Sequence, residues 1–413
     1  MNVRDVGAVG DGVTDDTLAF RTALEEAARL GEECFVPPGI YLIGNPGGIT
    51  APHRPAVTTG LRFHGENRDT CVLKIAAMPT NHLLQCGGDN WIVDGLTFDM
   101  GDFTPTVGSA AVLCKGTDWS VRDCAVIRSG RWGLQVQGGR DWSISDCYIQ
   151  RTVPGAQPPV GAVLVTREGA AWSQNGRLEN NRCEGGGITF TGSNGWIARN
   201  RIKRSGYGSG IYIQSSPSSY APTIYGNICS DGLSGYDDSQ GGRWWSVNGF
   251  EIWAPRALIY NNIAHDNDGG GIAVGGRASI VTGNVAYNNS RGRANGAGIT
   301  ARIMAESGAS GSVFIGNRSY DARYPDASAT QSYGYSEQVG GLTSIISVGN
   351  DYSQNKVGDA VYNSSGGRRN VSAKEAQRLQ LHIGGAMGER LFALSENVDL
   401  ASQIREIMKW LPI

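Results

Sequence analysis

The chain has 413 residues, a net charge of −2 and charged side chains at 18% of its positions. A sparsely charged, nearly neutral chain predicts no nucleic-acid partner and no anionic membrane surface as a partner. No apolar run reaches the ~18 residues that a membrane span needs. Glycine, at 60 residues, has no Gly-X-Y period, which excludes collagen.

The first 45 residues differ from the rest. Residues 10–16 are rich in turn formers and predict the start of a helix, which Thr14 or Asp15 can cap. Gly31 ends the helix, and residues 34–43 predict a strand, a Pro-Pro-Gly corner and a second strand. The apolar face of the helix comprises Phe20, Ala23, Leu24 and Ala27.

This opening resembles that of the pectate-lyase and polygalacturonase superfamily of right-handed parallel β-helices. In that superfamily Phe-Gly-Ala-x-Gly-Asp-Gly-x-Thr-Asp-Asp-Thr precedes a helix and a Pro-Pro-Gly-x-Tyr strand. The resemblance implies a helix that covers the N-terminal end of a solenoid, with Asp11, Asp15 and Asp16 in turn and cap roles. Hydrolases, lyases, epimerases and phage tailspikes share the opening, so it implies the fold more than the reaction. The matching residues are Val6, Gly7, Ala8, Gly10, Asp11, Gly12, Thr14, Asp15, Asp16, Thr17, Pro37, Pro38, Gly39 and Tyr41.

A repeat follows, in which a small residue, usually Gly, precedes a short alternating strand, and Asn or Asp precedes a small or apolar residue. Repetition of one structural unit predicts a solenoid. The glycines are Gly133, Gly161, Gly187, Gly210, Gly249, Gly271, Gly298 and Gly334. The Asn and Asp positions are Asp123, Asp146, Asn181, Asn200, Asn227, Asn262, Asn284, Asn317 and Asn350.

The spacing of the repeat gives the length of one coil. Trp91, Trp119 and Trp142 occur in near-copies of one segment, at intervals of 28 and 23 residues, which suits three short strands and three corners. The interval from Asn227 to Asn262 is 35 residues, and its surplus predicts a loop that leaves the coil. Loops on a rigid scaffold are where binding residues concentrate.

Five of the eight cysteines, Cys114, Cys124, Cys147, Cys183 and Cys229, fall on the repeat. We interpret them as small buried side chains stacked coil on coil, rather than as a disulfide framework or a zinc site.

The tail predicts helix, with Ser372 and Glu375 in a capping-box pattern. It serves either as a lid on the last coil or as an oligomer contact. The predicted organisation is an N-terminal cap over 1–45, a parallel β-helix over 46–370 and a C-terminal helical cap over 371–413. The apolar positions of the tail are Leu379, Ile383, Ile404, Ile407, Met408 and Leu411.

Alternate residues of a strand face opposite sides, so the residue two after each repeated Gly is predicted to point outward. Stacked coils align these residues about 4.8 Å apart. The resemblance implies that this face is a sugar-binding groove. The predicted outward set is Gln135, Gln137, Val163, Val165, Thr189, Thr191, Tyr212, Gln214, Glu251, Trp253, Ala273, Thr300, Arg302 and Ser336.

Glu251 is the only carboxylate in this row. Asp268 and Asp238 are expected to lie near it. A pair of carboxyl groups is the requirement of glycoside hydrolysis. Glu251 is therefore the candidate general acid, with Asp268 or Asp238 as base or nucleophile. The alternatives are a surface glutamate at 251, a turn-forming aspartate at 268 and a solvated loop at 238.

Aromatic and polar neighbours complete the candidate site. Trp244 and Trp245 lie in the surplus loop, where each ring either stacks on sugar or packs under the loop. His265 either orients the substrate or is a corner residue, and Arg302 can bind a sugar carboxylate. The candidate substrate-binding residues are Trp244, Trp245, Trp253, Tyr212, Arg302, His265 and Gln214.

The leading hypothesis is an all-β solenoid enzyme that hydrolyses an oligo- or polysaccharide, with no cofactor and no metal. The catalytic motifs of the polygalacturonases and mannuronan epimerases are not matched. The alternatives are a polysaccharide lyase that performs β-elimination on uronates, and a non-catalytic glycan-binding solenoid such as a phage spike. The oligomeric state is left open, with a homo-oligomer such as a trimer as one possibility. The location is also left open: the N-terminus has no apolar stretch like that of a signal peptide, and an extracellular or phage-associated protein is one possibility.

Overall fold

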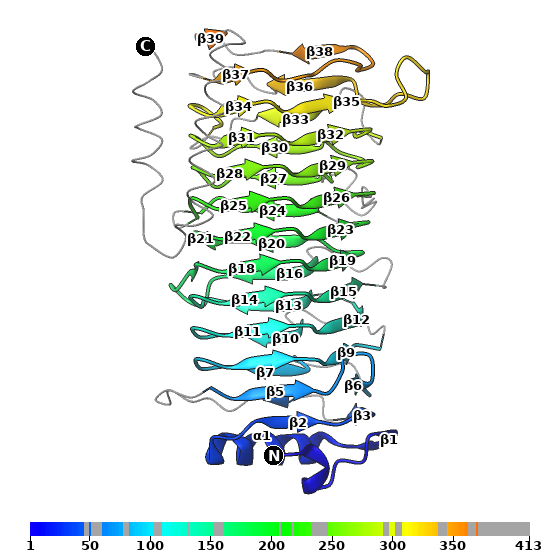
Figure 1. The fold of residues 1–413 in the computed structure, drawn as a ribbon, viewed down its shortest axis with the longest axis vertical. Helices are drawn as coiled ribbons and strands as arrows, with labels where there is room; N and C mark the ends of the chain where they lie inside the picture. The colour runs from blue at the N-terminus through cyan, green and yellow to red at the C-terminus, as the bar shows by residue number, and fades with distance from the viewer. Residues whose placement is uncertain are drawn as a thin grey trace.

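The computed structural model describes residues 1–44, 49–50, 60–76, 82–101, 110–130, 132–151, 161–205, 208–216, 219–232, 247–291, 297–301, 308–337, 345–361 and 369–370. Over these residues the chain winds into a right-handed parallel β-helix whose coils stack into a column (Figure 1). Along the chain, successive strands enter sheet A, then sheet B, then sheet C. The fold predicted from the repeat is confirmed.

The strands are short, and most contain three residues. Sheet A contains β2 (Cys34–Val36), β5 (Arg62–Gly65), β8 (Ile92–Asp94), β11 (Ser120–Arg122), β14 (Ser143–Ser145), β18 (Arg177–Glu179), β22 (Trp196–Ala198), β25 (Thr223–Tyr225), β28 (Leu258–Tyr260), β31 (Ile280–Thr282), β34 (Val313–Ile315), β37 (Ile346–Val348) and β39 (Arg369–Asn370). Sheet B contains β1 (Asp11–Asp15), β3 (Gly39–Ile43), β6 (Cys71–Ile75), β9 (Thr97–Asp99), β12 (Ala125–Ser129), β15 (Tyr148–Arg151), β19 (Arg182–Glu184), β23 (Arg201–Lys203), β26 (Ile228–Ser230), β29 (Ile263–His265), β32 (Val285–Tyr287) and β35 (Arg318–Tyr320). Sheet C contains β4 (Ile49–Thr50), β7 (Leu84–Cys86), β10 (Ala110–Cys114), β13 (Trp132–Gln137), β16 (Gly161–Thr166), β20 (Ile188–Phe190), β24 (Ile211–Ile213), β27 (Phe250–Ile252), β30 (Ile272–Val274), β33 (Ala297–Ala301), β36 (Tyr333–Glu337) and β38 (Gly358–Val361). A separate pair consists of β17 (Ser173–Gln174) and β21 (Gly192–Ser193).

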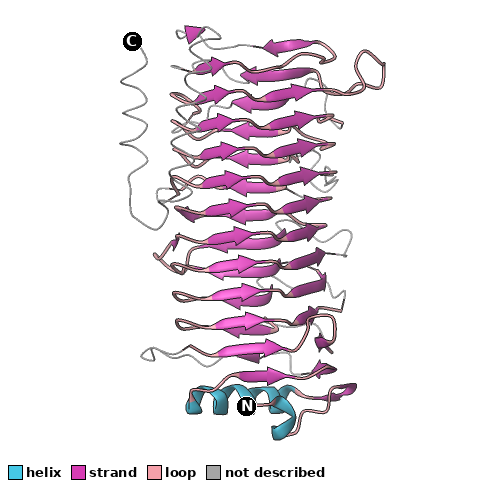
Figure 2. Ribbon diagram, viewed as in Figure 1, coloured by secondary structure: helices cyan, strands magenta, loops and turns pink. Residues whose placement is uncertain are grey.

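The N-terminal end is covered by the 3-10 helix η1 (Val3–Val6) and the α-helix α1 (Thr17–Leu30) (Figure 2). The four predicted apolar residues of α1 are buried, and the Phe20 ring packs edge-on against Tyr41 at 5.1 Å. Gly31 ends the helix in the left-handed conformation, with φ 72°. This end confirms the predicted helix, its apolar face and its stop.

The cap of α1 differs in detail from the prediction. Asp16 is the residue before the helix, and its carboxylate accepts from the backbone N–H of Val9, at 2.7 Å. Asp15 accepts from the Thr17 N–H at 3.0 Å, and the Thr17 hydroxyl bond lowers the pKa of Asp15. Thr14 was wrongly expected as a cap, because its hydroxyl donates to Asp11 in the preceding turn.

The interior is a column of stacked side chains. Trp119 lies parallel to Trp91 at 4.7 Å and to Trp142 at 5.2 Å, which confirms that their spacing marks successive coils. All eight cysteines are buried with free thiols. Burial raises the pKa of Cys183 to about 12, so its thiol stays protonated and inert.

The corner between sheets A and B contains a ladder of buried asparagines. The Asn262 Oδ1 accepts from the backbone N–H and the amide of Asn227, at 2.9 and 3.0 Å. The Asn262 amide in turn donates to Asn284 Oδ1 at 3.0 Å and to two backbone carbonyls. This pattern repeats through Asn181, Asn200, Asn227, Asn262, Asn284, Asn317 and Asn350.

From β8 to β34 every corner between sheets A and B consists of two residues. The intervals between strands that enter or leave sheet C are longer, as from Arg151 to Gly161 and from Ser230 to Phe250 between sheets B and C. Sheet C is therefore the sheet with long connections at both of its edges. Among the helices that the structure describes, none is long and apolar enough to span a bilayer.

One coil of sheet C has a register that the sequence analysis got wrong. Leu164 pairs with Gln135 and Thr189, so Leu164 faces outward while Val163 and Val165 lie in the core, both at 0% exposure. Gly161 pairs with Trp132 and not with Gly133. A shift of one residue moves every side chain of a strand to the other face.

Candidate active site

The outward row of sheet C brings residues from distant parts of the chain into contact. Register pairing aligns Thr189 with Tyr212, Tyr212 with Glu251, and Glu251 with Ala273. Adjacent members lie on neighbouring strands, about 4.8 Å apart. Glu251 is thus the carboxylate in the central strand of a mostly uncharged row, as the alternation predicts.

Three donors fix the Glu251 side chain. Its Oε2 accepts from the Ser209 hydroxyl at 2.8 Å and from the Asn248 amide at 3.2 Å. Its Oε1 accepts from the Trp253 indole N–H at 3.0 Å. The indole and the amide N–H groups can only donate, so both carboxyl oxygens of Glu251 accept a hydrogen bond. The side chain is partly buried and oriented from both sides of its strand.

Ser209 and Asn248 were missed by the sequence analysis. Each directly precedes a repeated glycine, Gly210 or Gly249, and the two lie side by side at the entrance of adjacent strands. Asn248 is almost fully buried, and its Oδ1 accepts from the Gly270 N–H at 2.8 Å. The polar residue before the glycine was a usable signal, because the other repeated glycines follow Trp132, Val160, Gly186, Gly270, Ala297 and Tyr333.

Tyr212 is the neighbour of Glu251 on the adjacent strand. Burial, followed by the negative charge of Glu251, raises the pKa of the Tyr212 phenol. Its hydroxyl therefore stays protonated at neutral pH and can donate a hydrogen bond or a proton.

Asp268 lies in the corner that leads from sheet B into β30. Its Oδ1 is 3.5 Å from Arg291 Nε, and Arg291 also lies 3.9 Å from Asp231. Two residues after Asp268, the Gly270 N–H binds Asn248, which in turn binds Glu251. The backbone two residues after Asp268 is thus joined to Glu251 through one buried asparagine, while the Asp268 carboxylate itself contacts Arg291.

His265 ends β29 in sheet B rather than in sheet C. Its Nδ1 lies 2.7 Å from Asp266 Oδ2, and its ring stacks on Tyr287 at 4.8 Å. His265 is thus an outward residue at the end of a sheet B strand, and not the corner residue that the sequence analysis offered as an alternative.

Trp253 and Gln214 share the second outward row of sheet C. The Trp253 ring is 8% exposed and lies against Gly275, where an added Cβ would come within 1.7 Å of the ring. Trp253 thus orients Glu251 and offers little open ring surface. Gln214 is exposed, and its Oε1 accepts from Thr191 at 3.0 Å. Asp238, Trp244, Trp245 and Arg302 lie outside the described residues.

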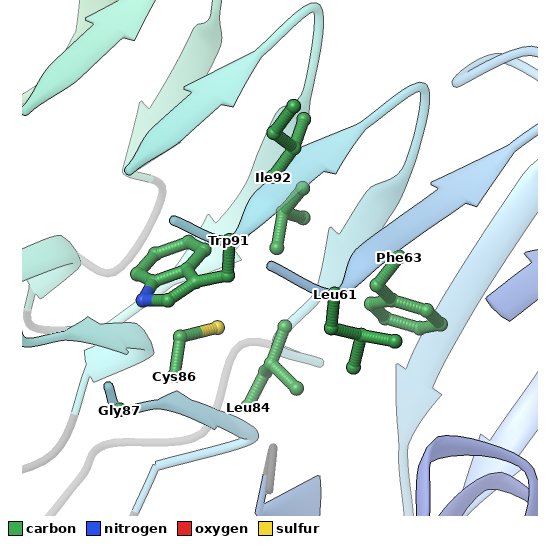
Figure 3. Close-up of a pocket in the computed structure, with 8 residues that line it drawn as sticks. Leu61, Phe63, Leu84, Cys86, Gly87, Trp91 and Ile92 are labelled. Atoms are coloured by element: carbon green, nitrogen blue, oxygen red, sulfur yellow. The ribbon is translucent and has the colours of Figure 1, made fainter. Parts of the chain in front are cut away.

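The cavity in Figure 3 is a separate feature, near the N-terminal end of the column. It has a volume of about 20 Å³ and is lined by apolar groups such as Leu61, Phe63 and Leu84. A space of that size holds about one water and lacks the polar partners that a water requires. In the described part of the chain, no three His, Cys, Asp or Glu side chains gather as a metal site would need.

Comparisons with solved structures agree with this architecture. The A-module of mannuronan C-5 epimerase AlgE4 from Azotobacter vinelandii superposes with a TM-score of 0.71 at 15% identity, over 90% of this chain and all of the module. The Dettilon tailspike protein superposes with a TM-score of 0.57 at 15% identity, over 87% of this chain and 68% of its own. At such identities the likeness establishes the fold alone.

Sequence comparisons give shorter matches. The SPbeta prophage-derived protein YomE of Bacillus subtilis is 27% identical over 153 residues, which cover 36% of this chain and 23% of YomE. A probable glucan endo-1,3-beta-glucosidase of Arthroderma benhamiae is 38% identical over 55 residues, which cover 11% of this chain and 6% of that protein. This chain thus aligns with less than a quarter of the length of either protein. The model of one family matches residues 1–237, more than half of the sequence, and the chain therefore belongs to the rhamnogalacturonase A/epimerase, pectate lyase-like family.

Proposed function

We propose that the chain is a carbohydrate-active enzyme that hydrolyses glycosidic bonds on the outward face of sheet C, with Glu251 as the reacting carboxylate. The observation that carries this proposal is the fixed geometry of Glu251. Three donors from Ser209, Asn248 and Trp253 orient a partly buried carboxylate on a surface row. A surface glutamate without a function has no need of such positioning.

Hydrolysis requires two carboxyl groups with different roles. Glu251 supplies one of them, as the general acid that the sequence predicts or as the base or nucleophile. The second carboxyl group comes from Asp268, whose corner is joined to Glu251 through the Gly270 N–H and Asn248, or from Asp238. The Asp268 carboxylate contacts Arg291 at 3.5 Å, and Asp238 lies outside the described residues.

The remaining residues bind the sugar in this proposal. Tyr212 lies beside Glu251 in its row, the exposed Gln214 lies in the second row, and the two offer hydroxyl and amide contacts. Trp244 and Trp245 supply rings for sugar C–H faces, and Arg302 supplies a cation for an acidic sugar. His265 acts at the rim, since Asp266 and Tyr287 already engage its ring.

The comparisons support a carbohydrate ligand. The matched family is described by a rhamnogalacturonase and an epimerase, and the structural neighbours include a mannuronan epimerase and tailspikes. A short segment also matches a probable glucanase. These likenesses agree on carbohydrate and differ on the reaction.

A second candidate is proton abstraction from a uronate, as in a lyase or an epimerase. The observation that favours it is the contact between strands that places the Tyr212 phenol beside Glu251. In that reaction Glu251 abstracts or shares the proton and Tyr212 donates one to the leaving oxygen. Elimination leaves an unsaturated sugar that absorbs ultraviolet light, whereas hydrolysis does not.

The test is a panel of neutral and acidic polysaccharides treated with the wild type, Glu251→Gln and the control Glu184→Gln. Glu184 is an outward glutamate of sheet B, remote from this row. Reducing ends that appear without new ultraviolet absorbance, with wild type and Glu184→Gln but not with Glu251→Gln, support hydrolysis at Glu251. New ultraviolet absorbance selects elimination. Glycan binding without turnover by any variant would select the non-catalytic reading, and unchanged turnover in Glu251→Gln removes this residue from the mechanism.

A further inference from the structure

Sheet A changes character halfway along the column. In β11, β14 and β18 the outward residues are polar or charged: Ser120, Arg122, Ser143, Ser145, Arg177 and Glu179. From β22 to β34 the same two rows are mainly apolar: Trp196, Ala198, Tyr225, Leu258, Tyr260, Ile280, Val313 and Ile315. We call the second set the sheet A apolar face. The backbone is the same in both halves, so the difference lies in what each half contacts.

Four residues of the sheet A apolar face, Ala198, Leu258, Tyr260 and Ile315, are buried, and the other four are half-buried. Leu258 is 8% exposed, Tyr260 6% and Ile315 0%, yet none of them belongs to the contiguous core cluster that contains their inward neighbours Ile259 and Phe314. An outward row of a solvated sheet is normally polar. Contiguous apolar outward residues mark a surface that binds another segment or molecule.

We propose that the sheet A apolar face is the docking surface for the C-terminal segment of this chain, residues 371–413. The segment begins directly after β39, and β39 is the last strand of sheet A, paired with β37. The chain therefore enters this segment from the sheet that bears the apolar face. Its sequence carries the matching apolar positions Leu379, Ile383, Ile404, Ile407, Met408 and Leu411.

The dimensions agree. The order of sheet A places β39, β37, β34, β31, β28, β25 and β22 in succession, so the distance from β39, where the segment begins, to β22, at the far end of the face, is about 29 Å at the usual strand spacing. A helix spans that length with about 20 residues, fewer than residues 371–413 provide. A lid on the last coil alone, as the sequence analysis considered, leaves the face from β22 to β34 without a partner.

The test is the reactivity of a cysteine placed on the face of the full-length chain. Thr282→Cys lies on the outward row between Tyr260 and Ile315. Ser145→Cys is the matched control on the same row of the polar half, with a similar half-buried environment. The native thiols are all buried, so the wild type gives the background of maleimide labelling.

Each cysteine variant is combined with Ile407→Asp, on the apolar side of the tail, or with Ser402→Asp, on its polar side. Ile407→Asp should speed labelling of Thr282→Cys by about tenfold, because an apolar docking contact is lost and the segment opens locally. Ser402→Asp should leave that rate unchanged, and Ser145→Cys should react equally in every background. Ile404→Asp should repeat the effect of Ile407→Asp.

An unchanged rate of Thr282→Cys in both Ile407→Asp and Ile404→Asp would overturn the proposal. Fast labelling throughout means that the face is bare. Slow labelling throughout, with a dimer or trimer mass in light scattering, means that a second copy of the chain covers the face. Neither outcome bears on Glu251, which lies on sheet C.

Discussion

Two corners of the coil contain hydrogen-bonded ladders of side-chain amides, but the two corners have different roles. At the corner between sheets A and B, Asn262 and its equivalents form an unbroken ladder in turns of two residues. At the corner between sheets B and C, a shorter ladder runs from Asn267 through Asn289 and Gln331 to Asn355. Both ladders pair buried amides from coil to coil.

The two corners differ in whether additional residues are inserted between their strands. The corner of sheets A and B allows no insertion from β8 to β34, whereas the corner of sheets B and C admits long connections and bears Asp268 and the approach to Glu251. A closed ladder satisfies every buried amide and stabilises the coil. At a corner where inserted residues separate the strands, side chains can be turned toward a ligand. The first corner therefore maintains the fold, and the second varies the site.

The largest expected effect lies on the functional side of this comparison. Glu251→Gln should lower kcat about 10³-fold, because a carboxylate that accepts three hydrogen bonds is replaced by a neutral amide. The free energy of unfolding, measured by urea denaturation, should stay within about 1 kcal/mol of the wild type. A large loss of stability with retained kcat would place Glu251 among the structural residues instead.

At the corner between sheets A and B we expect the opposite pattern, a loss of stability without a loss of kcat. Asn262→Ala should lower the free energy of unfolding by about 3 kcal/mol, because Asn227 and two buried carbonyls lose their partners. The kcat of the folded fraction should not change. Asn261→Gly is the control, since Asn261 lies next to Asn262 in the left-handed conformation, φ 53°, that Gly adopts freely. Equal losses in the two variants would contradict the importance of the ladder.

Asn248 tests the comparison between the two corners, because it is a buried asparagine at the corner between sheets B and C. Asn248→Ala should lower kcat about tenfold with little change in KM, since Glu251 loses one of its three donors and its orientation. Steady-state kinetics separate the two constants. A change in KM alone would mean that Asn248 contacts substrate and does not position Glu251.

The smallest effect is the pH dependence of the free energy of unfolding, and it also concerns the corner between sheets B and C. His82 precedes β7, is 7% exposed and accepts from the Ala110 N–H at 3.0 Å. Burial lowers the pKa of His82 below its usual 6.5, so below that pH the unfolded chain binds a proton that the folded chain does not. The free energy of unfolding should therefore fall by up to about 1 kcal/mol between pH 7.5 and 5.5. His82→Gln, compared with wild type by denaturation at both pH values, should remove that part of the slope.

Much of this molecule is legible in its sequence. The intervals between Trp91, Trp119 and Trp142 predicted the coil, and alternation after Gly249 predicted that Glu251 faces outward. These are local periodicities, and a solenoid repeats local contacts from coil to neighbouring coil. The burial of Trp253 against Gly275 and the hydrogen bonds of Asn248 were not predicted, because they depend on which coils become neighbours.

The sequence by itself determined the coil, its N-terminal helix and the row on which Glu251 lies, since each follows from spacing along one strand or one helix. Only the tertiary structure decided the register of Leu164, the partners of Glu251 and the pairing of Asp268 with Arg291. The physical reason is that insertions change the number of residues between adjacent strands. Hydrogen bonds between coils, and not distance along the chain, then select which side chains meet.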